Sequence, residues 1–470
     1  MIDNDNIYLK TIASGEMTGA PEPHLYYMGI LSGLVLSTLY RLTGNGIPWF
    51  GIFLCASVAV PMVLLLNTVL KTCEKIWQYV IAYLLCILVF CSFFYQYFAK
   101  TQFTVATGVV GVGALFYLAT LRTEDKIGNY LVSAIPFLLL TAWSFGMRDK
   151  GFLMLIPFLG MTFLSKLTWD KQWKKNGNVV LLGIVFVALI ATIYGGNRLA
   201  YSSDEWKEFK EYTDASEILF DYNGFPAYET HRDLYHELGI TESSYKAIIG
   251  HYNILLDPAI NRDAMVRLAQ VAEEERIAAA PALPEKIVSV LKDIVQRNLF
   301  DYVDRPLNVL VFFLYAFVVI LALLKREWMA LRDVAFLVIA RMTDWIYLVW
   351  FGRYPFRVTQ IIYLAELVCL VAVLINYELW ANRKAFTAML VGIVFLSFRF
   401  GFPVMRNANA QIKDFRAMSV CFPELEEYLE VHSDNFYYFD MSHLYYMEDT
   451  LAFEPSDYEN YVYMGSWMPN

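Results

Sequence analysis

Long apolar stretches recur along this sequence of 470 residues, and they limit what the chain can fold into. A helix needs about 20 predominantly apolar residues to cross about 30 Å of hydrocarbon. With 57% hydrophobic and only 18% charged residues, the chain is poorer in charge than soluble domains, which average about 25%. We therefore predict an all-α polytopic membrane protein with about ten transmembrane helices and one juxtamembrane helix. The candidate stretches run over residues 25–43, 47–70, 76–98, 101–121, 129–146, 151–166, 178–197, 306–325, 333–352, 358–379 and 385–404.

The Lys and Arg residues of short loops predict which side of the membrane each loop faces. The basic loops "KLTWDKQWKKN", "LLKREWMALRD" and "NRK" are expected inside. Counting crossings from them places "GMRDKG", "GRYPFR" and both long polar blocks outside. The predicted division is a membrane module with its first outer loop over 1–200, an extracytoplasmic helical cap over 201–305, membrane helices over 306–404, and an extracytoplasmic tail over 405–470.

The first apolar stretch decides on which side the N-terminus lies. If residues 25–43 cross the membrane, Asp3 and Asp5 are cytoplasmic, whereas a helix lying on the outer surface puts both aspartates outside. The polar residues of this stretch and Arg41 favour the surface position. The chain then starts outside with no preceding span, so we expect a transmembrane helix upstream of residue 1.

Both long polar blocks are acidic, and they carry the excess negative charge of a chain whose net charge is −9. The block 201–305 has apolar residues at helical spacing, and "LGITESSYKAII" is typical of a helix start with Thr241 as N-cap. The tail predicts a short helix and an aromatic strand over 436–439, a small α/β unit. The six cysteines show no metal-ligand spacing, and nothing in the charge pattern supports nucleic-acid binding.

Several charged residues and glycines fall inside predicted spans. Arg341 and Asp344 are spaced i,i+3 and are expected to pair, while Glu366 has Arg341 or Arg399 as candidate partners. Such groups also occur in proton-coupled transporters, which keeps that class open. The glycines of "TGVVGVG" predict close helix packing, because no strand precedes them as a nucleotide-binding loop would require.

Carboxylates and arginines collect on the predicted outer face. Arginine binds phosphate oxygens in bidentate fashion, and a carboxylate can take the proton of an attacking hydroxyl. This combination suits group transfer from an anionic lipid-linked donor. Each residue also has a simpler interpretation, as a solvated tail, a helix cap or an interfacial anchor. The residues concerned are Asp3, Asp5, His24, Arg148, Lys150, Arg353 and Arg357.

The acidic N-terminus followed by "IASGEMTGAPEPHLYYMGILSGLVLSTLYRLTGNGIPWF" resembles the GT-C fold integral membrane glycosyltransferases of bacterial envelopes. The segments "YETHRDLYHELGI", "GRYPFR" and "NFYYFD" also look like this family. The resemblance implies an outer loop that carries acidic residues, followed by juxtamembrane helices on the outer surface.

The family's acidic pair falls on Asp5 and Asn6, with Asp3 slightly upstream. The resemblance implies Asp5 as catalytic base with Asp3 second, Glu22 and His24 near the donor phosphate, and the three arginines Arg148, Arg353 and Arg357 on the polyprenyl phosphate. Asparagine at the second acidic position weakens the case for a divalent cation, so no cofactor is expected.

The implied function is sugar transfer from a polyprenyl-phosphate donor to an envelope glycan, lipid or protein at the outer face of the cytoplasmic membrane. Two alternatives stay open. A polysaccharide polymerase or ligase shares the many spans and the outer arginines, and a transporter or flippase would use Glu366, Arg341 and Arg399.

Overall fold

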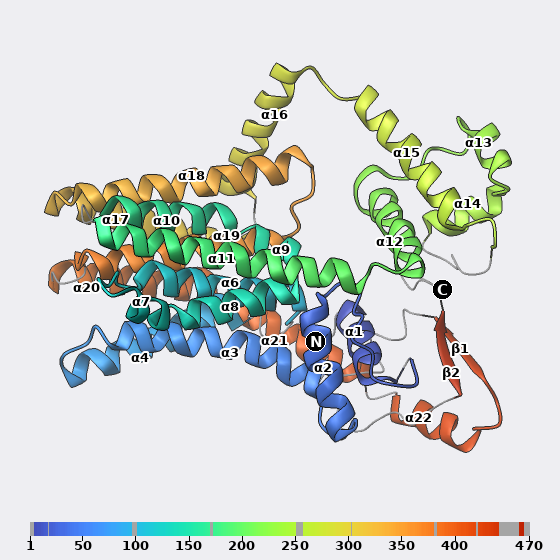
Figure 1. Ribbon diagram of the computed structural model, residues 1–470, viewed down its shortest axis with the longest axis horizontal. Helices are drawn as coiled ribbons and strands as arrows, with labels where there is room; N and C mark the ends of the chain where they lie inside the picture. Colours follow the sequence, from blue (N-terminus) through green and yellow to red (C-terminus); the bar gives the residue numbers. More distant parts are fainter. Residues whose placement is uncertain are drawn as a thin grey trace. The chain divides into compact units, whose positions relative to one another are not determined.

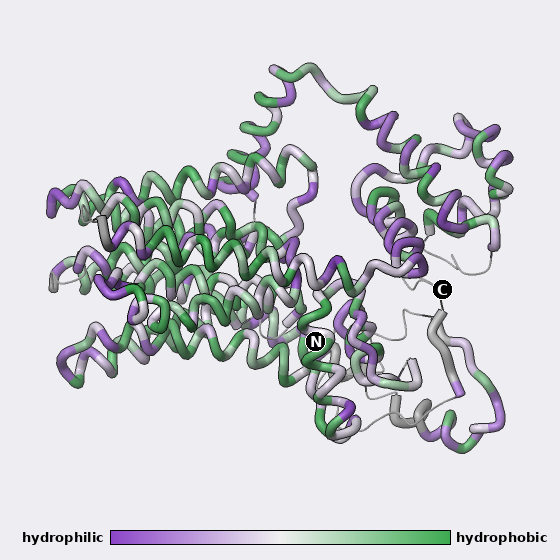
Figure 2. The backbone as a smooth tube through the Cα atoms, in the orientation of Figure 1, coloured by the Kyte–Doolittle hydropathy of each residue, from purple (hydrophilic) through white to green (hydrophobic). Residues whose placement is uncertain are grey.

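The computed structural model describes residues 4–16, 18–95, 101–169, 173–250, 257–301, 303–379, 383–419, 422–440 and 460–464. The chain divides into two compact units, one of residues 1–197, 293–417 and 449–455 and the other of residues 198–292, 418–448 and 456–470. The first unit is a bundle of apolar helices, and the second carries most of the polar helices (Figures 1 and 2).

The bundle contains the predicted membrane helices. Among the described residues, seven helices are long and apolar enough to cross a membrane, or eight if α7 and α8, bent by 45°, form one span. The chain is therefore a helical, polytopic membrane protein. The bundle helices are α3 (Trp49–Leu70), α4 (Ile76–Val89) with the π-helix η1 (Phe90–Phe94), α6 (Phe103–Thr120), α7 (Ile127–Ser133), α8 (Ile135–Met147), α9 (Asp149–Leu153), α10 (Ile156–Trp169), α11 (Trp173–Ala200), α17 (Leu307–Lys325), α18 (Trp328–Trp350), α19 (Phe356–Asn376), α20 (Arg383–Leu396), the π-helix η5 (Ser397–Gly401) and α21 (Phe402–Ser419).

Two predicted spans differ in the structure. The stretch 151–166 is divided between the short helices α9 and α10, and the 14 residues of α10 reach about 21 Å at 1.5 Å per residue, short of about 30 Å of hydrocarbon. Helix α18 has 23 residues, so it is long enough to cross, but it carries Arg332, Asp333, Arg341 and Asp344.

Helix α6 lies at the centre of the bundle and packs against α3, α8 and α19. Its glycines permit these close approaches: a Cβ at Gly108 would lie 2.5 Å from Ile361 Cγ1, and one at Gly113 would lie 2.6 Å from Pro61 Cβ. Larger side chains would separate the helices, as in other tightly packed membrane helices. The predicted packing role of "TGVVGVG" is confirmed.

Two helices at the N-terminus lie across one end of the bundle, α1 (Asn4–Ser14) and α2 (Ile30–Thr43) (Figure 1). The start of α2 is bonded to the end of α8, through Ser32 Oγ to the Gly146 carbonyl at 2.9 Å. Its last turn meets the start of α3, where the Phe50 N–H donates to Tyr40 Oη at 3.0 Å. Both termini of this 14-residue helix therefore lie at the same end of the bundle, which we call the Asp5 end.

The second unit contains a helical region with its own apolar core. Its helices are α12 (Asp204–Glu217), the π-helix η2 (Ile218–Asn223), α13 (Arg232–Glu237), α14 (Glu242–Ile249) and α15 (Arg262–Ala278), and α16 (Leu283–Val295) follows and continues into the π-helix η3 (Gln296–Phe300). Leu219, Tyr235 and Met265 are among the buried side chains of this core. Thr241 caps α14 by accepting the Ser244 N–H at 3.1 Å, which confirms the predicted helix start.

The C-terminal region begins within a helix. The helical segment Lys384–Asp414 runs unbroken through η5, so it continues past the boundary predicted at 404/405. Its 31 residues span about 46 Å, more than the hydrocarbon requires. Beyond it lie α22 (Phe422–Val431) and two parallel strands, β1 (Tyr437–Asp440) and β2 (Tyr461–Met464), paired from Tyr437–Tyr461 to Asp440–Met464.

Candidate functional site

The acidic N-terminal segment is helical, not the loop expected from its sequence. Asp5 lies in the first turn of α1 and is half-buried. Its neighbour Asn6 is buried and joins α1 to the start of α6: Asn6 Nδ2 donates to the Thr101 carbonyl at 2.8 Å, and its Oδ1 accepts the Phe103 N–H at 3.1 Å. These two bonds fix Asp5 beside the first residues of α6.

Asp5 and Arg148 each bind a residue at the start of α6, at this end of the bundle. Gln102 Nε2 donates to Asp5 Oδ2 at 3.3 Å. Arg148, which follows α8, donates to Thr104 Oγ1, and its guanidinium lies 4.8 Å from the centre of the Phe103 ring. The N-cap residue of α6, Gln102, therefore contacts Asp5, and the next two residues, Phe103 and Thr104, contact Arg148.

Tyr27 packs near the aromatic ring that Arg148 contacts. Its ring centre is 6.4 Å from that of Phe103. Burial raises the pKa of Tyr27, the negative charge of Asp5 raises it further, and the positive charge of Arg148 lowers it. The tyrosine is therefore neutral and within electrostatic reach of both groups. Asp5, Tyr27, Gln102, Thr104 and Arg148 form what we call the Asp5 site.

The two other predicted arginines lie at the same end of the bundle but come from α19 and the loop before it. Helices α6 and α19 both start at the Asp5 end and touch at Gly108 and Ile361 (Figure 1). Thr104 and Arg357 each precede these contact residues by one helical turn, so they lie at the same level on helices about 8–10 Å apart. Arg353 and Arg357 are both half-buried.

Glu22 and His24 lie away from Asp5. The Glu22 N–H donates to the Ile12 carbonyl at 3.2 Å, which places it beside the last turns of α1, whereas Asp5 is in the first. Seven residues of helix separate these positions by about 10 Å. Glu22 binds the ring of His24, so the two form a pair of their own. Asp3 lies outside the described residues.

A buried polar network beyond the Asp5 site joins α17, α18, α19 and η3. Arg341 binds Glu366, whose other oxygen accepts Tyr315 Oη at 2.7 Å. The expected pairing of Arg341 with Asp344 is wrong, because α19 brings Glu366 to the guanidinium while Asp344 Oδ2 has no hydrogen-bond partner. Arg399 is exposed and lies against Phe400, so it is not the partner of Glu366. Both Glu366 oxygens are therefore engaged in structural bonds.

The same network includes an ion pair that the sequence analysis missed. Arg297 in η3 donates to Asp304 at 2.9 and 3.1 Å, and Thr359 of α19 donates to Asp304 at 2.7 Å. The guanidinium of Arg297 also lies 5.6 Å from the ring centre of Tyr354, in the loop that carries Arg353. Arg297 and Asp304 are seven residues apart, which is no helical spacing, and Thr359 comes from a segment 55 residues beyond Asp304.

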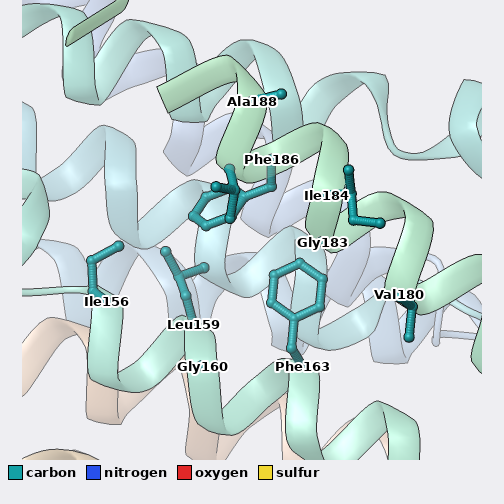
Figure 3. Close-up of a pocket in the computed structure, with 10 residues that line it drawn as sticks. Ile156, Leu159, Gly160, Phe163, Val180, Gly183, Ile184, Phe186 and Ala188 are labelled. Carbon is teal, nitrogen blue, oxygen red and sulfur yellow. The ribbon is translucent and has the colours of Figure 1, made fainter. Parts of the chain in front are cut away.

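An apolar groove of about 580 Å³ lies between α10 and α11 (Figure 3). Phe163 and Phe186 point into it, and Gly160 and Gly183 hollow its walls. A Cβ at Gly160 would meet no atom within 4 Å. The lining residues are Ile156, Leu159, Gly160, Phe163, Val180, Gly183, Ile184, Phe186, Val187 and Ala188.

No known protein family, curated protein or solved structure matches this chain. Within the described residues, no group of three or more His, Cys, Asp or Glu side chains is arranged to hold a metal ion. The chemistry of the Asp5 site therefore has to be argued from its own residues.

Proposed function

We propose that the chain is a membrane glycosyltransferase that moves a sugar from a polyprenyl-phosphate donor to a cell-envelope acceptor. The observation that carries the proposal is that Asp5 and Arg148 bind neighbouring residues at the start of α6, Gln102 and Thr104, at one end of an apolar bundle. A carboxylate for the acceptor and a guanidinium for the phosphate are the two groups that this reaction needs from the protein.

The reaction assigns a step to each charged group. The acceptor hydroxyl attacks the anomeric carbon of the donor sugar while Asp5 takes its proton. The bond between that carbon and the phosphate oxygen breaks, and polyprenyl phosphate leaves with the electron pair. Arg148 stabilises the charge that develops on the phosphate, and Arg357, at the start of α19, is a second candidate for the same anion. A direct displacement of this kind inverts the configuration at the anomeric carbon.

The groove between α10 and α11 suits the lipid tail of the donor. Ile156, at its near end, follows Arg148 by eight residues, through α9 and the turn that precedes α10. Val180, Ile184 and Val187 on the groove wall are exposed, as expected for side chains that face lipid. A phosphate at Arg148 would thus have an apolar path along the bundle for its isoprenoid chain.

The positive-inside rule favours a position of the Asp5 site on the side of the membrane away from the cytoplasm. The opposite end of the bundle carries Lys71, Lys166, Lys325 and Arg332 in short connections, which the positive-inside rule assigns to the cytoplasm. We assign the protein to the cytoplasmic membrane of a bacterium, where polyprenyl-linked sugars are presented on the outer face.

The test is sugar transfer in membranes that contain the chain, with a radiolabelled polyprenyl-phosphate sugar as donor. Asp5→Asn removes the base and keeps the shape, so we expect a loss of transfer of at least about 100-fold, as for other general bases. Arg148→Lys keeps the charge but loses the bidentate fork, so we expect a higher KM for the donor. Asp125→Asn, an exposed aspartate at the opposite end, is the matched control and should retain full activity.

Full transfer by Asp5→Asn would refute the assignment of the base. Extension of a polyprenyl-diphosphate oligosaccharide, with no transfer from the monophosphate donor, would identify a polymerase instead. Uptake or flipping of the labelled lipid without bond formation would identify a transporter.

A further inference from the structure

Helix α16 exposes a continuous apolar face. Leu283, Ile287, Val288, Leu291 and Val295 are all exposed, and Leu283 and Val288 are 62% and 67% accessible. We call these five residues the α16 stripe. At 100° per residue they cover an arc of about 140° on one side of the helix. Two buried residues lie on one side of this arc: Val290 borders it, and Ile294 falls between Leu283 and Ile287.

The remainder of α16 is polar. Glu285, Lys286, Ser289, Lys292 and Asp293 occupy the opposite side of the helix. A helix with one broad apolar face and one charged face either covers a protein core or lies in the interface of a membrane. Since the stripe is exposed, it does not cover a core within the described residues.

The stripe is continuous with the membrane-embedded bundle. Leu299, Phe300 and Val303, between α16 and α17, are each at least 50% exposed. The next helix, α17, is one of the candidate spans, and the polar side of η3 is fixed to the bundle by Arg297 on Asp304 and by Arg341 on Asn298. The apolar path from α16 therefore leads into a surface that already faces lipid.

We propose that the α16 stripe lies in the interfacial region of the bilayer, with acyl chains as its partner. The breadth of the stripe argues for lipid over a second copy of the chain, because a helix–helix seam is narrower. Its 13 residues are also fewer than the three to four heptads that a stable coiled coil needs. The proposal does not depend on the enzymatic function.

The test measures the surroundings of a nitroxide at two adjacent positions of the full-length chain in phospholipid vesicles. The six native cysteines are first replaced by alanine, and then Val288→Cys or Ser289→Cys is introduced and labelled. The two positions differ by 100° around the helix, so one faces the stripe side and the other the polar side. We expect the label at 288 to be accessible to oxygen but shielded from a water-soluble nickel chelate, as for a side chain about 5–10 Å below the headgroups. The label at 289 should show the reverse.

Three outcomes would overturn the proposal. Access of the nickel chelate to both labels would place the stripe in water. Dipolar broadening at 288 that disappears on dilution with unlabelled protein would show a second copy on the stripe. Shielding of 288 from both relaxing agents without broadening would show that the stripe packs against this same chain.

Discussion

The buried ion pair at the start of α17 makes the sharpest prediction about stability. Asp304 is fully buried and accepts two bonds from Arg297 and one from Thr359. Removing one member of a buried pair leaves the other charge uncompensated, at a cost of about 3–5 kcal/mol. Arg297 keeps a bond of 2.8 Å to Asp301, which is partly exposed and reduces that cost. We therefore expect Asp304→Leu to lower the free energy of unfolding by about 3 kcal/mol.

Removal of both partners should lower the free energy of unfolding less than removal of Asp304 alone. In Arg297→Met with Asp304→Leu, no buried charge is left unpaired, so the double variant should be more stable than Asp304→Leu alone by at least about 1 kcal/mol. The assay is equilibrium unfolding in mixed micelles, with helicity followed by circular dichroism as the denaturing detergent increases. Purely additive effects in this cycle, or an Asp304→Leu variant as stable as the parent, would refute the reasoning.

Two further predictions concern packing and pH. Gly33→Ala places a methyl group 1.8 Å from the Pro23 carbonyl oxygen, so we expect a loss of about 1–3 kcal/mol in thermal unfolding. Gly160→Ala, where no atom lies within 4 Å, is the control and should be neutral or stabilising by up to about 1 kcal/mol. The hydrogen bond from Arg276, the largest cause, lowers the pKa of Glu273 to about 2. The stabilisation that the ionised Glu273 carboxylate gives to α15 should be complete above the unfolded pKa of about 4.3 and lost as the pH falls through about 2. Hydrogen exchange in α15 measures this loss, and Glu273→Gln should abolish that part of the pH dependence; an unchanged profile would contradict it.

Much of the fold follows from local sequence patterns. Runs of about 20 apolar residues predict spans because the hydrocarbon thickness sets their length. The glycines of α6 predict close packing, and Thr241 predicts a helix start, because both depend on nearby residues. The boundary predicted at 404/405 follows a fall in hydropathy, which marks where a helix can leave the membrane but not where it ends, and α21 remains helical beyond that point.

The Asp5 site was only partly predictable. Charge counting placed Asp5, Arg148, Arg353 and Arg357 at one end, and the structure places them at the same end of the bundle. The sequence could not predict that Gln102 and Thr104 take part in the site, because they lie almost a hundred residues beyond Asp5. The separation of His24 from Asp5 likewise depends on the unforeseen helix α1.

The sequence alone determined that this is a helical membrane protein with long polar blocks between and after its spans, since burial in hydrocarbon acts on each apolar segment separately. Only the tertiary structure decided which charges meet. Arg341 lies three residues from Asp344 and yet binds Glu366 on another helix. Side chains at i and i+3 share one face of a helix and can pair. Here α19 packs against α18 and presents the Glu366 carboxylate directly to the Arg341 guanidinium. The pairing of charges inside the membrane is thus a property of how the helices pack.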